Sequence, residues 1–96
     1  MKQKYKELLL EIIEKRLPLC SVYLFGSRAQ NVHEPESDID LALDNNGIKI
    51  DTKIVVAIAD DISESTIPYF VDVVDLNGLS EDFRKEIEKD LVLWTK

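Results

Sequence analysis

Two aspartates separated by one residue, Asp38 and Asp40, are the side chains in this sequence best placed to do chemistry. They begin a segment, 38–43, that alternates polar and apolar residues as a half-buried strand does, and residues two apart on a strand leave the same face. Two carboxylates on one face repel each other and lose hydration, so bound cations would stabilise them. Mg²⁺ suits such a pair, because it takes oxygen ligands and leaves room for water and phosphate oxygens. The simpler interpretation of the pair alone is an edge strand with one solvated face.

Gly26 and Ser27 form a second pair, directly after the apolar run 19–25. An apolar strand followed by Gly-Ser and a short helical stretch aims backbone N–H groups and a hydroxyl at a phosphate, although a lone Gly-Ser pair is typical of an ordinary turn. Combined with the two acids, it predicts a nucleotide site. Two metal ions about 4 Å apart could there activate an attacking oxygen and stabilise a leaving pyrophosphate.

A third acid is expected on the apolar run 69–76, which contains Asp72 and Asp75. These residues are three apart, so a strand points them to opposite faces. The apolar neighbours of Asp72 predict a buried position, where a carboxylate is costly unless a cation compensates it. Asp75 lies at the end of the run beside a turn, where an acid is unremarkable. We therefore predict Asp72 as the third acid, with Asp75 as the alternative.

Four further side chains near these motifs carry groups that can take part in chemistry. Arg28 could reach a phosphate or simply be an exposed helical arginine, and Ser37 could orient the carboxylate of Asp38 or start the strand. His33 has no second histidine or cysteine nearby, which disfavours zinc. Cys20 lies in an apolar strand without basic neighbours, which disfavours a nucleophilic role.

The elements that must position these residues follow from hydrophobic periodicity. A helical stripe ends before Pro18, a second follows a candidate N-cap at Asp51, and a third follows a candidate N-cap at Ser80. We expect helices over 5–17, 50–62 and 80–94, one or two helical turns over 27–32, a turn at 44–47, and strands over 19–25, 38–43 and 69–76. The predicted order is α-β-α-β-α-β-α, an α/β (α+β) fold in which helices cover a small sheet.

Composition limits the function. The 96 residues carry 19 acidic against 12 basic side chains, a net charge of −7, and 45% are hydrophobic. We expect one domain over 1–96. The acid excess disfavours nucleic acid and anionic membrane surfaces as partners, but bound metal ions would still let the protein take an anionic substrate. No apolar run is long enough to span a membrane, and the single cysteine fits a reducing, cytoplasmic location.

The segments Gly26-Ser27-Arg28-Ala29 and Ser37-Asp38-Ile39-Asp40-Leu41 resemble the signature of the nucleotidyltransferase superfamily that shares the polymerase-β-type palm. The resemblance implies a small mixed sheet, two Mg²⁺ ions and ATP or another nucleoside triphosphate as substrate. By position, Gly26 and Ser27, with Arg28 and Ser37 beside them, match nucleotide-binding residues. Asp38 and Asp40 match metal ligands. Asp72 matches the third carboxylate, a general base for the acceptor hydroxyl and a metal ligand.

The short length is similar to the minimal nucleotidyltransferase (MNT) branch of that superfamily. This implies a helical HEPN-type partner protein, with the small enzyme acting as an antitoxin that adds AMP to a hydroxyl of the toxin. The alternatives are an antitoxin that neutralises its partner by binding alone and a small-molecule, antibiotic-type nucleotidyltransferase subunit; a homodimer is also compatible with the sequence. One departure stands out: Gln30-Asn31 occupies the place where the family usually has Arg-Gly.

Overall fold

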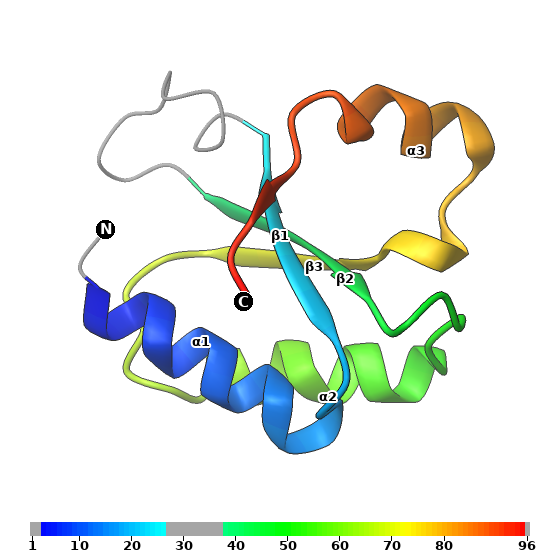
Figure 1. Ribbon diagram of the computed structural model, residues 1–96. Coiled ribbons are helices and arrows are strands. Elements are labelled where there is room, and N and C mark those ends of the chain that lie inside the picture. The colour runs from blue at the N-terminus through cyan, green and yellow to red at the C-terminus, as the bar shows by residue number, and fades with distance from the viewer. Residues whose placement is uncertain (1–2, 27–37, 96) are drawn as a thin grey trace.

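The computed structural model describes residues 3–26 and 38–95. Figure 1 shows a sheet with helices on both faces. The elements in chain order are α1 (Gln3–Arg16), β1 (Ser21–Phe25), β2 (Ile39–Asp44), α2 (Thr52–Ser63), β3 (Val71–Asp75), the 3₁₀ turn η1 (Leu76–Gly78), α3 (Glu81–Glu88) and β4 (Val92–Leu93). None of the helices in these ranges combines the length and apolarity that crossing a membrane requires.

The sheet is mixed, with strand order β3-β2-β1-β4. β1 pairs antiparallel with both β2 and β4, whereas β2 and β3 run parallel. Parallel neighbours need a long crossover connection, which α2 supplies here. The small mixed sheet predicted from the sequence is therefore confirmed.

One face of the sheet packs against α1 and α2, which lie side by side below it in Figure 1. The buried side chains of this core alternate along the strands and recur at helical spacing in α1 and α2. They include Leu9, Ile13, Val22, Leu24, Ile39, Leu41, Leu43, Ile58 and Ile62. The N-cap prediction for α2 is confirmed, because the Asp51 side chain accepts a hydrogen bond from the Lys53 N–H at 2.9 Å.

The opposite face has a smaller cover. There α3 contributes Ile87, which joins Phe25, Ala42 and Leu76 in a second buried cluster. The helix begins at the predicted cap, Ser80, whose hydroxyl accepts a hydrogen bond from the backbone N–H of the third residue after it at 3.3 Å. In Figure 1, α3 lies toward the ends of β2 and β3, away from where both strands start.

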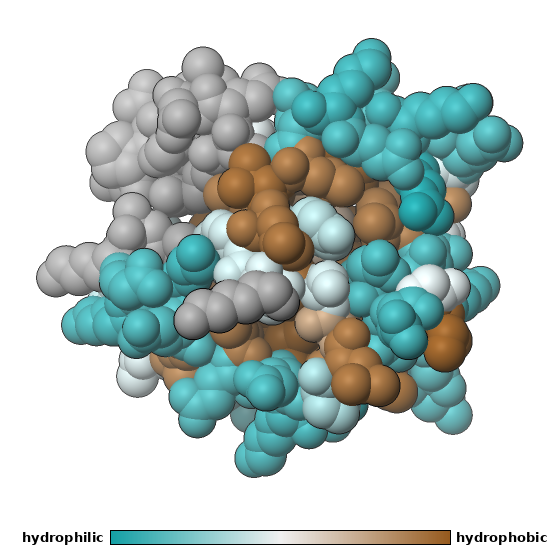
Figure 2. Space-filling model, in the orientation of Figure 1, coloured by the Kyte–Doolittle hydropathy of each residue, from teal (hydrophilic) through white to brown (hydrophobic). Residues whose placement is uncertain are grey.

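The prediction of a helix over 80–94 is wrong in its second half. α3 ends at Glu88, and Val92 and Leu93 form the short strand β4 on the edge of β1. The Trp94 N–H donates to the Val22 carbonyl at 2.8 Å. An apolar segment that reaches an open strand edge gains ladder hydrogen bonds, which outweigh its helical spacing. Hydrophobic side chains gather in the middle of Figure 2, where β4 lies in Figure 1, and both strand residues are exposed.

The other differences concern element ends. β1 starts two residues after the predicted strand and leaves Leu19 exposed, and β3 is two residues shorter than predicted at its start and one at its end. The turn at 44–47 is confirmed, with positive φ at Asn46 and Gly47. The predicted helical turns over 27–32 lie outside the described residues.

Candidate active site

The register of β2 and β3 brings two of the predicted acids together. Asp40 and Asp72 are directly paired neighbours on the two parallel strands. The residues that flank them along each strand, such as Ile39 and Val71, pack into the core with α1 and α2. Both carboxylates therefore lie on the opposite face of the sheet, on strands whose spacing is about 4.8 Å. Asp38 lies one residue before β2 and is exposed.

The charges of this acid cluster (Asp38, Asp40 and Asp72) act on one another. Burial, and then the negative charges of Asp72 and Asp38, raise the pKa of Asp40 above its usual value. No lysine or arginine within 3–26 and 38–95 forms an ion pair with any of the three. Uncompensated negative charge of this kind favours the binding of a cation, and a bound cation would lower the pKa of Asp40 again.

Gly26 ends β1 beside the acid cluster. Phe25 is the register partner of Asp40, and Gly26 follows with φ of +75°. A Cβ at Gly26 would overlap a carboxylate oxygen of Asp40 and lie 3.3 Å from its Cγ. Gly26 belongs to the candidate phosphate-binding pair, and the structure gives a second reason for a glycine at this position, because the Asp40 carboxylate occupies the space that a side chain would need. Ser27, Arg28, Gln30-Asn31, His33 and Ser37 lie outside the described residues.

The two candidates for the third acid differ in their surroundings. Asp75 pairs in register with the core residue Leu43, so it lies on the other face from Asp72, as the spacing predicts. Its carboxylate accepts hydrogen bonds from the backbone N–H groups of Ile50 at 2.9 Å and Asn77 at 3.2 Å. Asp75 thus caps η1 and ties it to the segment before α2. The geometry favours Asp72 over Asp75 as the third acid.

The expectation that Asp72 is buried is wrong, since its side chain is exposed. Its apolar neighbours in the sequence are split between the two faces of β3, and β3 is the outer strand of the sheet. The carboxylate therefore meets solvent rather than the side chains of Val71 and Val73, which pack against the core on the other face.

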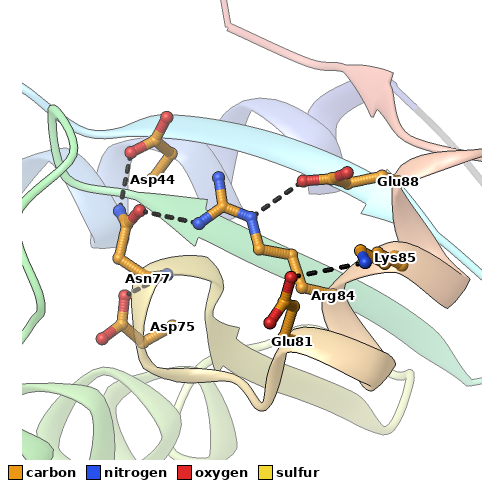
Figure 3. A network of polar contacts seen from close by, with 7 residues as sticks. All are labelled: Asp44, Asp75, Asn77, Glu81, Arg84, Lys85 and Glu88. Carbon is orange, nitrogen blue, oxygen red and sulfur yellow. Dashed lines mark hydrogen bonds and ion pairs between the residues drawn. The ribbon is translucent and has the colours of Figure 1, made fainter.

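A second polar network occupies the far ends of the same two strands (Figure 3). Asp44 accepts hydrogen bonds from the Asn77 side-chain amide at 2.8 Å and from the Gly47 N–H at 2.9 Å. These bonds, the first above all, lower the pKa of Asp44. Arg84 donates to the Asn77 amide oxygen at 3.3 Å and to Glu88 at 2.8 Å. Sequence reasoning missed this network. Only the position of Asp44 as the first residue of the predicted turn at 44–47 indicated that its carboxylate could accept a backbone hydrogen bond.

The donor set at the acid cluster suits a hard divalent ion. Carboxylate oxygens are the ligands that Mg²⁺ prefers, and these ones lack a basic partner among the described residues. Within the described ranges, however, no three His, Cys, Asp or Glu side chains converge into a complete metal site. What the structure brings together is the pair Asp40 and Asp72, with Asp38 next to it in the chain.

Cys20 is half-buried, and burial, with a smaller contribution from the charge of Asp44, raises the pKa of its thiol to about 11. A thiol with so high a pKa carries little thiolate near neutrality, and the thiolate is the nucleophilic form. This supports the prediction that Cys20 is not a nucleophile.

A family model described as "Polymerase beta, Nucleotidyltransferase" matches residues 7–96 of the chain. The chain belongs to this nucleotidyltransferase family. The membership and the fold predicted from the two sequence segments are confirmed. The matched range contains the three strands β1, β2 and β3 and the three residues of the acid cluster of this nucleotidyltransferase.

Individual relatives agree with the family assignment. The "probable protein adenylyltransferase MntA" of Haemophilus influenzae is 34% identical over 82 residues, which cover 85% of this nucleotidyltransferase and 71% of the relative. Two solved structures show the same fold. A toxin–antitoxin structure with AMP-PNP has a TM-score of 0.78 and 23% identity, over 94% of this chain and 72% of the other. The structure of the tri-AMPylated HEPN toxin of Shewanella oneidensis in complex with the MNT antitoxin has a TM-score of 0.76 and 22% identity. This match covers 99% of this chain and 72% of the other.

Proposed function

We propose that this nucleotidyltransferase is a Mg²⁺-dependent protein adenylyltransferase that transfers AMP from ATP to a hydroxyl of a HEPN-type helical partner and thereby acts as an antitoxin. The observation that carries the proposal is the pairing of Asp40 with Asp72 beside Gly26. The register pairs Asp72, the proposed base for the acceptor, with Asp40, a proposed metal ligand, and this supports the proposal.

The proposal gives each acid a task. Asp38 and Asp40 would hold the divalent ions, with Asp72 as the third ligand, and the bound metal would neutralise the triphosphate and favour departure of pyrophosphate. Asp72 would accept the proton of the acceptor hydroxyl at a carboxylate oxygen. The hydroxyl oxygen then forms a bond to the α-phosphorus, and the bond to the pyrophosphate oxygen breaks. Gly26 and Ser27, with Arg28 and Ser37, would cradle the phosphates.

The choice of acceptor rests on the relatives. The similar protein of Haemophilus influenzae is named an adenylyltransferase that acts on protein, and a structure with the same fold contains an AMPylated HEPN toxin. On the face that carries Asp40 and Asp72, α3 packs toward the far ends of β2 and β3 and Asp72 is exposed, which supports a macromolecular acceptor.

The test is transfer of label from [α-³²P]ATP in the presence of Mg²⁺, with and without the product of the neighbouring reading frame as the candidate partner. We expect the partner to be labelled by the wild type, and labelling to fall at least about a hundredfold in Asp40→Asn, because one metal-binding charge is lost. Asp60→Asn is the matched control, since that exposed carboxylate lies on α2, across the sheet from the site.

Two outcomes would contradict the proposal. If the wild type left the partner unlabelled but still neutralised it, the protein would be an antitoxin that acts by binding alone. If Asp40→Asn labelled the partner as well as Asp60→Asn does, the acid cluster would not be the catalytic centre.

A further inference from the structure

Phe70 is a large apolar side chain left in solvent next to the acid cluster. It immediately precedes β3, and its phenyl side chain is 70% exposed. The carbonyl oxygen of Phe70 accepts a hydrogen bond from the Ile39 N–H at 2.9 Å, so the ladder between β2 and β3 extends to this residue. The phenyl group is therefore carried by backbone that is fixed to the strand of Asp40.

The packing of its neighbours determines the face on which Phe70 lies. Tyr69 and Val71 both pack against the core formed with α1 and α2. Consecutive side chains of an extended segment alternate between faces, so Phe70 lies on the opposite side, two residues from Asp72 and on the same face. An exposed aromatic ring thus flanks the proposed general base.

The order of the strands puts Phe70 on a definite side of the reaction centre. Gly26 ends β1 on one side of Asp40, and Asp72 and Phe70 belong to β3 on the other side. In an in-line displacement the attacking and leaving oxygens lie on opposite sides of the phosphorus. With the phosphates held at Gly26, the acceptor hydroxyl approaches over β3. β3 is also an outer strand of the described sheet, which leaves room for a protein on that side.

We propose that Phe70 is the residue on which the acceptor protein packs, so that an apolar segment of the acceptor covers the phenyl ring and its hydroxyl is held beside Asp72. This inference rests on the proposed transfer to a protein. The acceptor segment must carry apolar side chains next to its hydroxyl, because burial of the ring gives the contact its free energy. Phe70 positions the acceptor and takes no part in binding the triphosphate.

The test separates acceptor binding from nucleotide binding. In the labelling assay with the same candidate partner, we expect Phe70→Ala to raise the KM for that protein about tenfold, the effect of removing an aromatic contact at the centre of an interface. The Kd of a fluorescent ATP analogue with Mg²⁺ should stay within about twofold. Phe70→Leu should recover most of the affinity for the acceptor. Leu19→Ala is the matched control: it removes a side chain that is 74% exposed, before the start of β1 and at the far end of that strand from Gly26, and should change neither constant.

Each other result is decisive. A weaker Kd for the ATP analogue with an unchanged KM for the acceptor would make Phe70 a platform for the nucleotide base and overturn the inference. Equal KM values for wild type and Phe70→Ala would overturn it while leaving the proposed function intact. Absence of label from the partner with the wild type would overturn the proposed function and the inference together. Circular dichroism of each variant checks that the fold is retained.

Discussion

Aspartates lie at both ends of the β2–β3 strand pair, but their surroundings differ. At the start of the strands, Asp40 and Asp72 lie next to each other, without a basic partner among the described residues, and the pKa of Asp40 is raised. Near the other end, Asp44 and Asp75 each accept two hydrogen bonds, and the pKa of Asp44 is lowered. The difference separates acids that stabilise the fold through hydrogen bonds from the acids for which we propose a catalytic role.

This contrast arises from what faces each carboxylate. N–H groups of η1 and of the turn after β2 donate hydrogen bonds to Asp75 and Asp44, and for Asp44 such bonds lower the pKa. At the starts of the strands the neighbour of one carboxylate is another carboxylate. Hydrogen bonds therefore stabilise one end of the strand pair, whereas repulsion between carboxylates costs stability at the other end, where we propose that cations bind.

The largest expected effect distinguishes Asp72 from Asp75. Asp72→Asn should reduce labelling of the partner about a hundredfold or more, because the proposed proton acceptor is lost. Asp75→Asn should keep most of the activity and instead lower the free energy of unfolding by about 1–3 kcal/mol, since one backbone N–H loses its acceptor. The measurements are the labelling assay and urea unfolding. The reverse pattern would make Asp75 the third acid.

The next effect concerns the glycine beside Asp40. Gly26→Ala should lower the Mg²⁺ affinity and the labelling rate about tenfold or more, because the new methyl group displaces the Asp40 carboxylate. Gly47→Ala is the matched control, since Gly47 has a similar φ, +79°, and nothing within 4 Å of the added Cβ. Both variants should lose about 1 kcal/mol of stability from backbone strain. Equal Mg²⁺ affinities in the two variants would show that the contact with Asp40 is irrelevant.

A smaller effect is expected at the hydrogen-bonded end. Asp44→Ala removes the acceptor of two hydrogen bonds and should lower the free energy of unfolding by about 1–2 kcal/mol. The loss should appear near neutral pH. It should shrink as the pH falls, because the lowered pKa of Asp44 stabilises the fold above the usual aspartate pKa and this contribution is lost as the pH drops through the folded value. Urea unfolding at several pH values, with Asp60→Ala as control, measures it.

The smallest expected effect is a gain in stability, at Asp40. Because the pKa of Asp40 is raised in the folded state, ionisation of Asp40 destabilises the fold as the pH rises through that folded-state pKa. A variant with an uncharged side chain at this position avoids the loss. Asp40→Asn should therefore be more stable than the wild type near neutral pH, by less than about 1 kcal/mol, and lose this advantage in acid. Mg²⁺ should stabilise the wild type and not the variant. A destabilised Asp40→Asn would show that this end of the strands is not under charge repulsion.

Local signals were enough to predict most of the elements. Helical stripes gave α1 and α2, the residues Asp51 and Ser80 gave two N-caps, and alternation gave β2. Each of these depends on residues close together in the chain. The prediction failed at β4, where the open edge of a distant strand decided between helix and strand for an apolar segment.

For the candidate site, the sequence indicates which residues to consider, but it does not indicate how they lie relative to one another. The spacing of Asp38 and Asp40 predicts a shared face. The apolar context that favoured Asp72 over Asp75 also predicted a buried side chain, and that side chain is exposed. That Asp72 lies directly beside Asp40 depends on the register of two strands joined through α2, which no short motif encodes. The contact between Gly26 and Asp40 and the Asn77–Arg84 bridge are likewise long-range.

The parallel pairing of β2 and β3 also links the assembly of the site to folding. Asp40 and Asp72 meet only after the chain has completed α2 and returned, so this contact belongs to the long-range pairings that form slowly. β3 is an outer strand, and outer strands exchange their amide hydrogens through local opening more readily than central ones. A molecule that has detached β3 can keep much of its helical core and yet have no acid pair. Amide exchange at 71–75 would then report the fraction of molecules in which the proposed metal site is assembled.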